Sequence, residues 1–195
     1  PRHGIRILPG PSSLWLDATG ERLPVPGLPG FDTLGTLKLL RATGHDHSWF
    51  VLTQQIIEKE FALSGSEQNP DLTNRSVREL ARQRLGKGAT EPVEAFKSRG
   101  ADFAVAGTLD ELVAKMNTIT GADLLDVATV RRHVLARDRE LANPFTKDLQ
   151  VAALRQARSY RGDRLIRVAR PHRLLDPKAG PLIAVRLHVL TRKTL

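Results

Sequence analysis

The sequence predicts an α+β fold in which a mainly helical region is flanked by short strands. Residues 1–30 combine short apolar runs with many prolines and glycines, which is typical of strands and loops. Apolar residues then recur at helical spacing behind N-cap signals as far as residue 160, and residues 183–189 alternate as in a half-buried strand. We therefore divide the chain into a strand and loop segment (1–30), a mostly helical domain (31–178) and a returning strand (179–195).

The strands are predicted from short apolar runs bounded by turn residues. Residues 13–17 form the first strand, and Ala18-Thr19-Gly20-Glu21 forms a turn that leads into Arg22 and Leu23. A second short strand is expected at 103–106, and the alternating residues 183–189 form the last.

The helices are predicted from caps and apolar periodicity. Asp32 suits the N-cap of a helix that Gly44 ends, and residues 48–63 are expected to form a second helix because Phe50, Ile57 and Phe61 share one face. Capping boxes at Ser76 and Thr108 open two more. Further helices are expected at 92–100, 126–140 and 147–160.

Charge and composition narrow the classes of partner. The chain has 30 Lys and Arg against 21 Asp and Glu, a formal net charge of +9, so it attracts anions. Aromatic residues make up only 5% and do not interleave with basic stretches, so nucleic acid is not an expected partner. There is no cysteine, signal peptide or transmembrane run, and we expect a cytoplasmic protein.

No catalytic or metal motif can be recognised from the residues alone. Gly86-x-Gly88 lacks a third glycine and a preceding strand, so it is no dinucleotide fingerprint. His45-Asp46-His47 has no further ligand nearby, and no metal site is predicted. The mixed charges of residues 126–140, among them Arg137 and Asp138, are spaced for ion pairs on a helix surface.

Several segments, in order, resemble the fumarate reductase/succinate dehydrogenase flavoprotein and 3-ketosteroid-Δ1-dehydrogenase family. Residues 10–23 resemble its strand–turn–strand "G-x-x-x-φ-φ-φ-N-x-x-G-x-R-F" (φ apolar), and Thr108-Leu109-Asp110-Glu111-Leu112 resembles "T-L-E-E-L-A". Further matches are residues 126–138 to the family's next helix, 143–148 to "G-x-D-x-x-F-G-R", 180–187 to "P-P-Y-Y-A-V-x-φ" and 192–195 to "H-H-T-M".

The resemblance implies part of an FAD-dependent oxidoreductase acting on CH–CH bonds. It implies a mainly helical substrate (capping) domain, flanked by strands of a larger FAD-binding fold, with hydride transfer between a substrate carbon and flavin N5. The chain starts at Pro1 and stops in a strand-like segment, so we expect a piece of a longer flavoprotein. The main FAD-binding motif is absent from it, and we expect the isolated piece to be inactive and to bind FAD weakly or not at all.

Departures from the fumarate reductase pattern favour a ketosteroid dehydrogenase-like enzyme. Pro9 and Gly30 stand near positions where the resemblance implies arginines, and Arg192 or Lys193 replaces a dicarboxylate-binding histidine. Phe31 lies near a steroid-binding tyrosine of the family and suits a steroid or another apolar ketone. The pocket candidates are Phe31, Arg192, Lys193 and Thr194, with Trp49 and Phe50 as apolar wall or as core.

Two alternatives remain open. The chain could belong to a dicarboxylate reductase whose cations come from other parts of the protein. It could also be a non-catalytic module that binds nucleic acid or another anion, since its net charge is +9.

Overall fold

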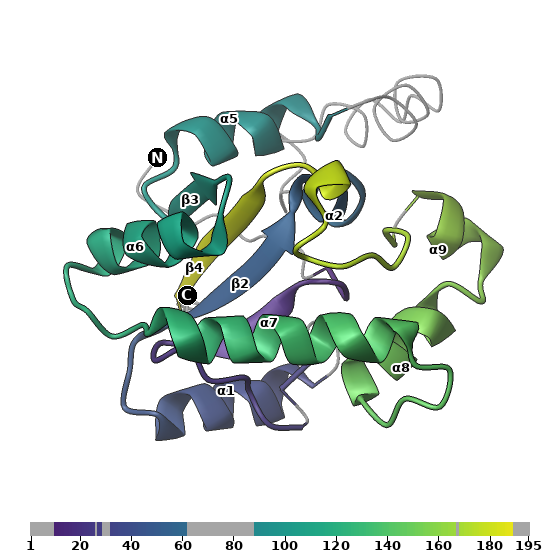
Figure 1. Ribbon diagram of the computed structural model, residues 1–195, viewed down its shortest axis with the longest axis horizontal. Helices are drawn as coiled ribbons and strands as arrows, with labels where there is room; N and C mark the ends of the chain where they lie inside the picture. Colours follow the sequence, from purple (N-terminus) through teal and green to yellow (C-terminus); the bar gives the residue numbers. More distant parts are fainter. Residues whose placement is uncertain (1–9, 26, 29–31, 62–87, 167, 189–195) are drawn as a thin grey trace, which may run out of the picture.

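The described residues form an α+β fold around one antiparallel sheet. The computed structural model describes residues 10–25, 27–28, 32–61, 88–166 and 168–188. The sheet has four strands in the order β1-β2-β4-β3, and every neighbouring pair is antiparallel (Figure 1). The strands are β1 (Leu14–Asp17), β2 (His47–Thr53), β3 (Phe103–Ala106) and β4 (Leu182–His188).

Helices cover the sheet and extend beyond it. They are α1 (Thr33–Ala42), α2 (Gln54–Glu60), α5 (Glu91–Arg99), α6 (Leu109–Thr120), α7 (Val127–Ala142), α8 (Leu149–Ala157) and α9 (Arg161–Ile166), with a 3-10 turn at Pro177–Ala179. α6 contacts β3 and β4, and α7 contacts α6 and α8. Figure 1 shows α6 and α7 crossing in front of the sheet, with α8 and α9 to one side.

The predicted helix at residues 48–63 is wrong in its first part. His47–Thr53 is the long strand β2, and the helix α2 begins only at Gln54. β2 lies between β1 and β4 and is buried along its whole length, so both of its faces are apolar and no alternation marks it as a strand. Its run of aromatic and β-branched residues was the available signal.

The predicted caps are confirmed where the structure describes them. The side chain of Asp32 accepts a hydrogen bond from Gly35 N (2.9 Å) at the start of α1, and Thr108 Oγ1 accepts one from Glu111 N (3.3 Å) at the start of α6. The turn after β1 also forms as expected, with Gly20 at φ 88°. The predicted helix from Ser76 to Leu85 lies outside the described residues.

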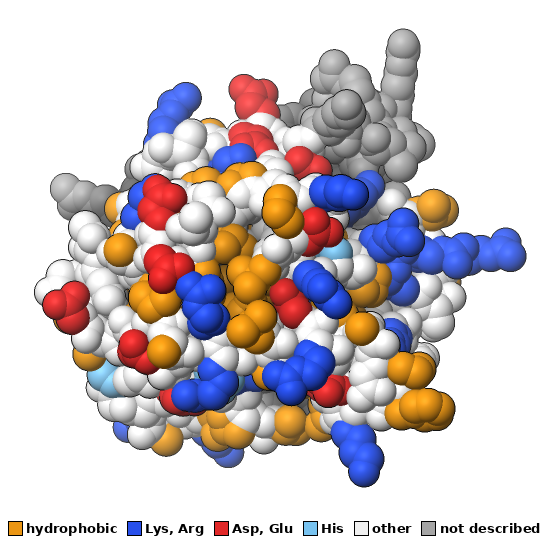
Figure 2. Space-filling model, in the orientation of Figure 1, with side chains coloured by type: hydrophobic (Ala, Val, Ile, Leu, Met, Phe, Trp, Pro, Cys, Tyr) orange, Lys and Arg blue, Asp and Glu red, His pale blue; other side chains and the backbone are white. Residues whose placement is uncertain are grey.

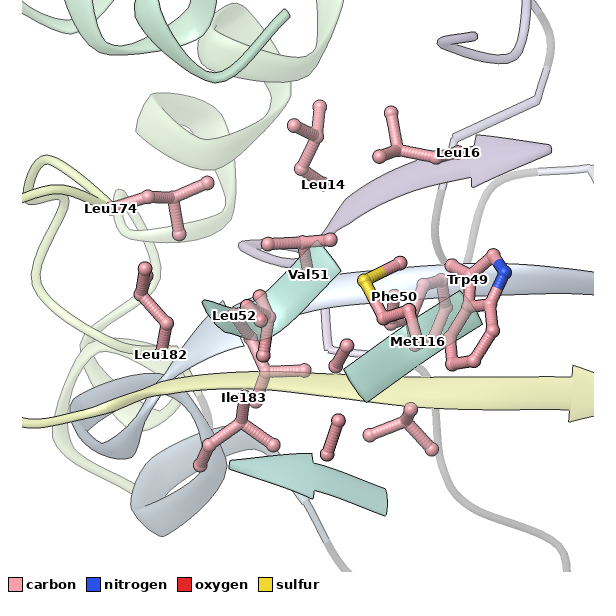
Figure 3. Packing of buried hydrophobic residues seen from close by; sticks show 14 of the residues in the cluster. Leu14, Leu16, Trp49, Phe50, Val51, Leu52, Met116, Leu174, Leu182 and Ile183 are labelled. Atoms are coloured by element: carbon pink, nitrogen blue, oxygen red, sulfur yellow. The ribbon is translucent and has the colours of Figure 1, made fainter. Parts of the chain in front are cut away.

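The core lies between the sheet and the helices. Figure 3 shows side chains from β1, β2, β4 and α6 contributing to it, among them Leu14, Trp49, Ile183 and Met116. Strands from each of the three predicted segments pair in this one sheet. The division of the chain into those three segments remains a prediction.

Candidate functional site

The most unusual feature of the described residues is a group of charged and polar side chains inside the protein. It consists of the buried Ser12, Glu60, Arg137 and Asp138 together with the half-buried His172, and we call this group the buried polar cluster. It lies at the end of the sheet where β1 begins and β2 ends. Ionised groups are seldom buried without partners, so the contacts of each member indicate what the cluster does.

Glu60, the last residue of α2, is 7% exposed and accepts three hydrogen bonds. Ser12 donates its backbone N–H to Oε2 (2.9 Å) and its hydroxyl to Oε1 (2.5 Å), and Ala169 N donates to Oε1 (2.8 Å). Burial raises the pKa of Glu60, although these hydrogen bonds oppose the increase. Gly10 allows the close approach, because a Cβ there would lie 2.6 Å from Glu60 Cβ.

Arg137 and Asp138 of α7 complete the charged part of the cluster. Arg137 is 1% exposed and donates to Ser12 O (2.9 Å), His172 O (3.3 Å) and Asp138 Oδ1 (3.1 Å). Asp138 in turn accepts hydrogen bonds from Leu174 N (2.8 Å) and Leu175 N (3.1 Å). Burial lowers the pKa of Arg137. The expectation that both residues lie on the helix surface is therefore wrong.

His172 joins the cluster to the end of β2. Its Nδ1 lies 2.7 Å from Arg170 O, and its Nε2 lies 2.7 Å from Thr53 Oγ1. A carbonyl oxygen can only accept, so Nδ1 carries the proton and a neutral ring accepts from the threonine hydroxyl at Nε2. Burial lowers the pKa of His172, which favours this neutral form.

A second set of side chains holds the same stretch of backbone from α8. Gln150 Nε2 donates to Ser13 O (2.6 Å) and Pro11 O (3.1 Å), and its Oε1 accepts from Arg22 (3.0 Å). Arg22 also makes two hydrogen bonds to Asp148. Together with Arg137, these side chains bind the carbonyls of residues 11, 12 and 13 in succession.

The cluster positions backbone and does not present a reactive group. The oxygens of Glu60 and Asp138 are occupied by donors, and both residues are buried. It fixes the segment that leads into β1 against residues 169–175, which lead towards β4. The cluster therefore has a structural role at this end of the sheet.

Of the six predicted pocket residues, the structure describes two. Trp49 and Phe50 are adjacent in β2 and both are buried: Phe50 packs edge-on against Trp15 and Phe61, and Trp49 against His47. Among the described residues they lie in the core, and their role as a pocket wall stays a prediction. Phe31, Arg192, Lys193 and Thr194 lie outside the described residues.

Titratable side chains also gather at the opposite end of the sheet, where β4 ends. His47 Nδ1 lies 2.8 Å from Asp46 Oδ1, and Asp102 Oδ1 contacts Arg186 Nε (2.6 Å) and His188 Nε2 (3.3 Å). In the described part of the chain no three such groups converge as metal ligands. The same part contains no helix of the length and apolarity that a bilayer crossing needs.

The described residues do not fit the pyrophosphate of a dinucleotide such as FAD. Such a site needs free N–H groups at a helix that directly follows a strand. At α2, Gln54 N is bonded to Pro181 O and Ile56 N to Thr53 Oγ1. The first turn of α6 carries Asp110 and Glu111, whose charges repel phosphate.

Comparison with known proteins assigns the chain to a family. The family model described as "FAD binding domain" matches residues 1–195. The chain belongs to this FAD binding domain family. The cofactor of the family is FAD. The described residues of this chain contain no site that fits the FAD pyrophosphate. No solved structure shows a significant match.

Curated relatives of this FAD binding domain chain are much longer proteins. It is 64% identical over 195 residues to a KsdD-like steroid dehydrogenase of Mycobacterium tuberculosis (strain CDC 1551 / Oshkosh), covering 100% of the chain and 34% of that protein. It is 63% identical over 195 residues to a KsdD-like steroid dehydrogenase of Mycolicibacterium smegmatis (strain ATCC 700084 / mc(2)155), covering 100% of the chain and 36% of the relative. The chain therefore spans about a third of the length of the curated relatives it matches.

Sequence reasoning missed the buried polar cluster, although a signal was present. Arg137 follows Val130 and Val134 at helical spacing, so it occupies the buried stripe of α7. Glu60 likewise follows the buried Ile56 and Ile57 of α2. A charged residue at an apolar position of a helix predicts a buried partner rather than a surface ion pair.

Proposed function

We propose that the chain is the substrate-side domain of an FAD-dependent oxidoreductase that acts on a CH–CH bond of a 3-ketosteroid or a similar apolar ketone. The observation that carries the proposal is identity of 63–64% over all 195 residues with proteins named KsdD-like steroid dehydrogenase. The matched range of 195 residues includes every element described above. The whole protein is proposed to be cytoplasmic, and the rest of its own flavoprotein chain is the proposed partner of this domain.

In this proposal the flavin, held mainly by other parts of the full-length protein, supplies the hydride chemistry at N5. Residues of this chain bind the substrate and exclude water from it. Phe31 would pack on a flat apolar substrate, with Arg192, Lys193 and Thr194 at the pocket and Trp49 and Phe50 behind it. Residues 31–178 would form the domain proper, and residues 1–30 and 179–195 would connect it to the FAD-binding part.

An exposed pair of leucines on α1 supports an apolar substrate. Leu34 and Leu37 on α1 are exposed, while Leu40 and Thr36 of the same helix are buried. Residues three apart on a helix are neighbours on its surface, so these two leucines form a small apolar patch that a flat apolar molecule could contact. We include Leu34 and Leu37 in the proposed substrate wall.

The test uses the full-length protein under anaerobic conditions. Its absorbance spectrum should show bound flavin, and a 3-ketosteroid with a saturated ring bond should bleach that spectrum as it reduces the flavin. Succinate should not bleach it, and fumarate should not reoxidise the reduced form. Reaction with fumarate but with no ketosteroid would instead identify a dicarboxylate reductase.

A matched pair of variants tests the pocket. Phe31→Ala should raise KM for the ketosteroid by roughly ten- to a hundredfold, because a buried aromatic contact contributes roughly 1.5–3 kcal/mol. Phe145→Ala removes an exposed ring and should leave KM unchanged. Equal KM values for the two variants would remove Phe31 from the pocket.

A further inference from the structure

The last three residues of β4 have a described strand on only one side. β2 pairs with β4 along its whole length, as far as His188 opposite His47. β3 pairs only with residues 182–185, so on that side the described part of the chain offers β4 no strand beyond Val185. A strand end that is paired on one side only can twist or fray unless another group holds it.

Asp102 takes the place of a strand on this open side. Its carbonyl oxygen accepts a hydrogen bond from Arg186 N (2.8 Å), as a neighbouring strand would. Its Oδ1 lies 2.6 Å from Arg186 Nε and 3.3 Å from His188 Nε2, and these two side chains share one face of the sheet because they are two residues apart. One residue outside the sheet therefore contacts both the backbone and the side chains at the end of β4.

Asp102 is itself held in position. It lies in the turn between α5 and β3, in which Phe103 N donates to Gly100 O (3.2 Å). Arg186 Nη1 donates in addition to Ile119 O (3.1 Å) in the last turn of α6, where the helix dipole favours a cation. These contacts tie the end of β4 to the turn before β3 and to the end of α6.

Few residues separate this end of β4 from the predicted pocket. Arg192 follows His188 by four residues, and four residues of extended chain span at most about 14 Å. The direction in which β4 leaves the sheet therefore limits where Arg192, Lys193 and Thr194 can stand.

We infer that Asp102 is a positioning residue, whose carboxylate fixes the direction of β4 and thereby holds residues 192–194 against the substrate. The inference rests on the proposed function, which places the substrate beside those residues. An isolated surface ion pair stabilises a protein little, but here three hydrogen bonds converge on Asp102, and the side chain of Arg186 is only 22% exposed. Asp46, another carboxylate at this end of the sheet, contacts His47 Nδ1 (2.8 Å) instead.

The test compares Asp102→Ala with the wild type in the full-length flavoprotein, with equal flavin content in every variant as the check on folding. Amide hydrogen exchange of residues 182–188 should be roughly tenfold faster, the lower range for lost hydrogen bonds to a charged group, because the site is partly exposed. KM for a 3-ketosteroid should rise roughly three- to tenfold. The value of kcat should stay within about twofold, because Asp102→Ala weakens binding of the ground state and the transition state alike.

Two matched variants separate the held strand from other effects of the substitution. Asp102→Asn keeps an accepting oxygen and should restore KM to within about twofold of the wild type. Acidic and basic side chains are interspersed on the face formed by α6 and α7 (Figure 2), and Asp110→Ala removes another such contact, the one with Arg131. Asp110 lies at the opposite end of α6 from Ile119, so this control should change neither exchange of residues 182–188 nor KM.

The outcomes distinguish this inference from the proposed function. An unchanged KM in Asp102→Ala, or an equal rise in Asp110→Ala, would overturn the inference. So would a KM for Asp102→Asn as high as that for Asp102→Ala, since the lost charge and not the lost contact would then set KM. When the wild type oxidises the ketosteroid, these results refute the inference alone. A wild type that oxidises no ketosteroid refutes the proposed function, and the inference with it.

Discussion

Replacing Arg137 with methionine should loosen the chain at both segments that the buried polar cluster joins. Methionine keeps much of the apolar stem but removes the donors to Ser12 O, His172 O and Asp138 Oδ1. Asp138 then remains buried without its cation, and two carbonyls lose a donor. Breaking a buried ion pair by removing one partner costs about 3–5 kcal/mol.

That free energy predicts a change large enough to measure locally. Since each 1.4 kcal/mol is a factor of about ten, the equilibrium for local opening should increase by roughly two to three and a half orders of magnitude. Amide hydrogen exchange followed by mass spectrometry reports this opening in peptides that cover residues 12–16 and 169–175. Their exchange should accelerate by that factor, while peptides from α5 should change little.

Arg132→Met is the control on the same helix. Arg132 pairs with Glu21 (2.8 Å), but both side chains are exposed, and such surface pairs contribute about 1 kcal/mol or less. In Arg132→Met, amide exchange of residues 12–16 and 169–175 should therefore change by less than about tenfold. If Arg137→Met exchanges no faster than Arg132→Met in residues 12–16 and 169–175, the cluster does not hold these segments together.

Further outcomes follow from the same contacts. Because the pKa of Glu60 is raised, the folded state holds the proton of Glu60 more tightly than the unfolded chain does. The wild type should therefore lose stability relative to Glu60→Gln as pH rises above about 4.3. Urea midpoints of the two proteins that run parallel across pH would contradict this. The pKa of His172 is lowered, so its contribution should disappear as pH falls below about 6.5, and an imidazole resonance titrating at or above that pH would refute it. Gly10→Ala should destabilise by about 1–3 kcal/mol through contact with Glu60, whereas Gly107→Ala, which meets no atom within 4 Å, should be nearly neutral in thermal unfolding. The isolated 195-residue chain should purify without stoichiometric flavin, and a yellow preparation would contradict the misfit at α2 and α6.

The sequence predicted those helices whose first turn is capped by a side chain close in sequence. Thr108, Asp126 and Asp148 each accept a hydrogen bond from a backbone N–H three residues ahead, so α6, α7 and α8 begin close to where the sequence places them. The helix expected at 147–160 ends earlier, at Ala157, and α9 follows from Arg161.

The central strand and the buried polar cluster depend on contacts distant in sequence. β2 is a strand because β1 and β4 flank it, and its two apolar faces also suit a helix when read locally. Glu60 meets Ser12 and Ala169, which lie 48 and 109 residues away. The periodicity of the sequence cannot predict pairs of residues so far apart. The position of a charged Glu60 on the apolar face of a helix did indicate that it needs a buried partner.

The order of the sheet leaves β1 and β3 at its margins, where unpaired peptide groups can recruit strands from other molecules. Residues 21–23 fold back along β1, so that Asp17 N donates to Glu21 O (2.8 Å) and Leu23 N to Trp15 O (3.2 Å). On β3, the ammonium of Lys115 occupies Val105 O (2.8 Å) and places a charge beside the strand. Residues 21–23 thus cover the margin at β1, and Lys115 places a charge beside the margin at β3 that opposes strand addition, so Lys115→Ala should make the protein more prone to form β-rich aggregates.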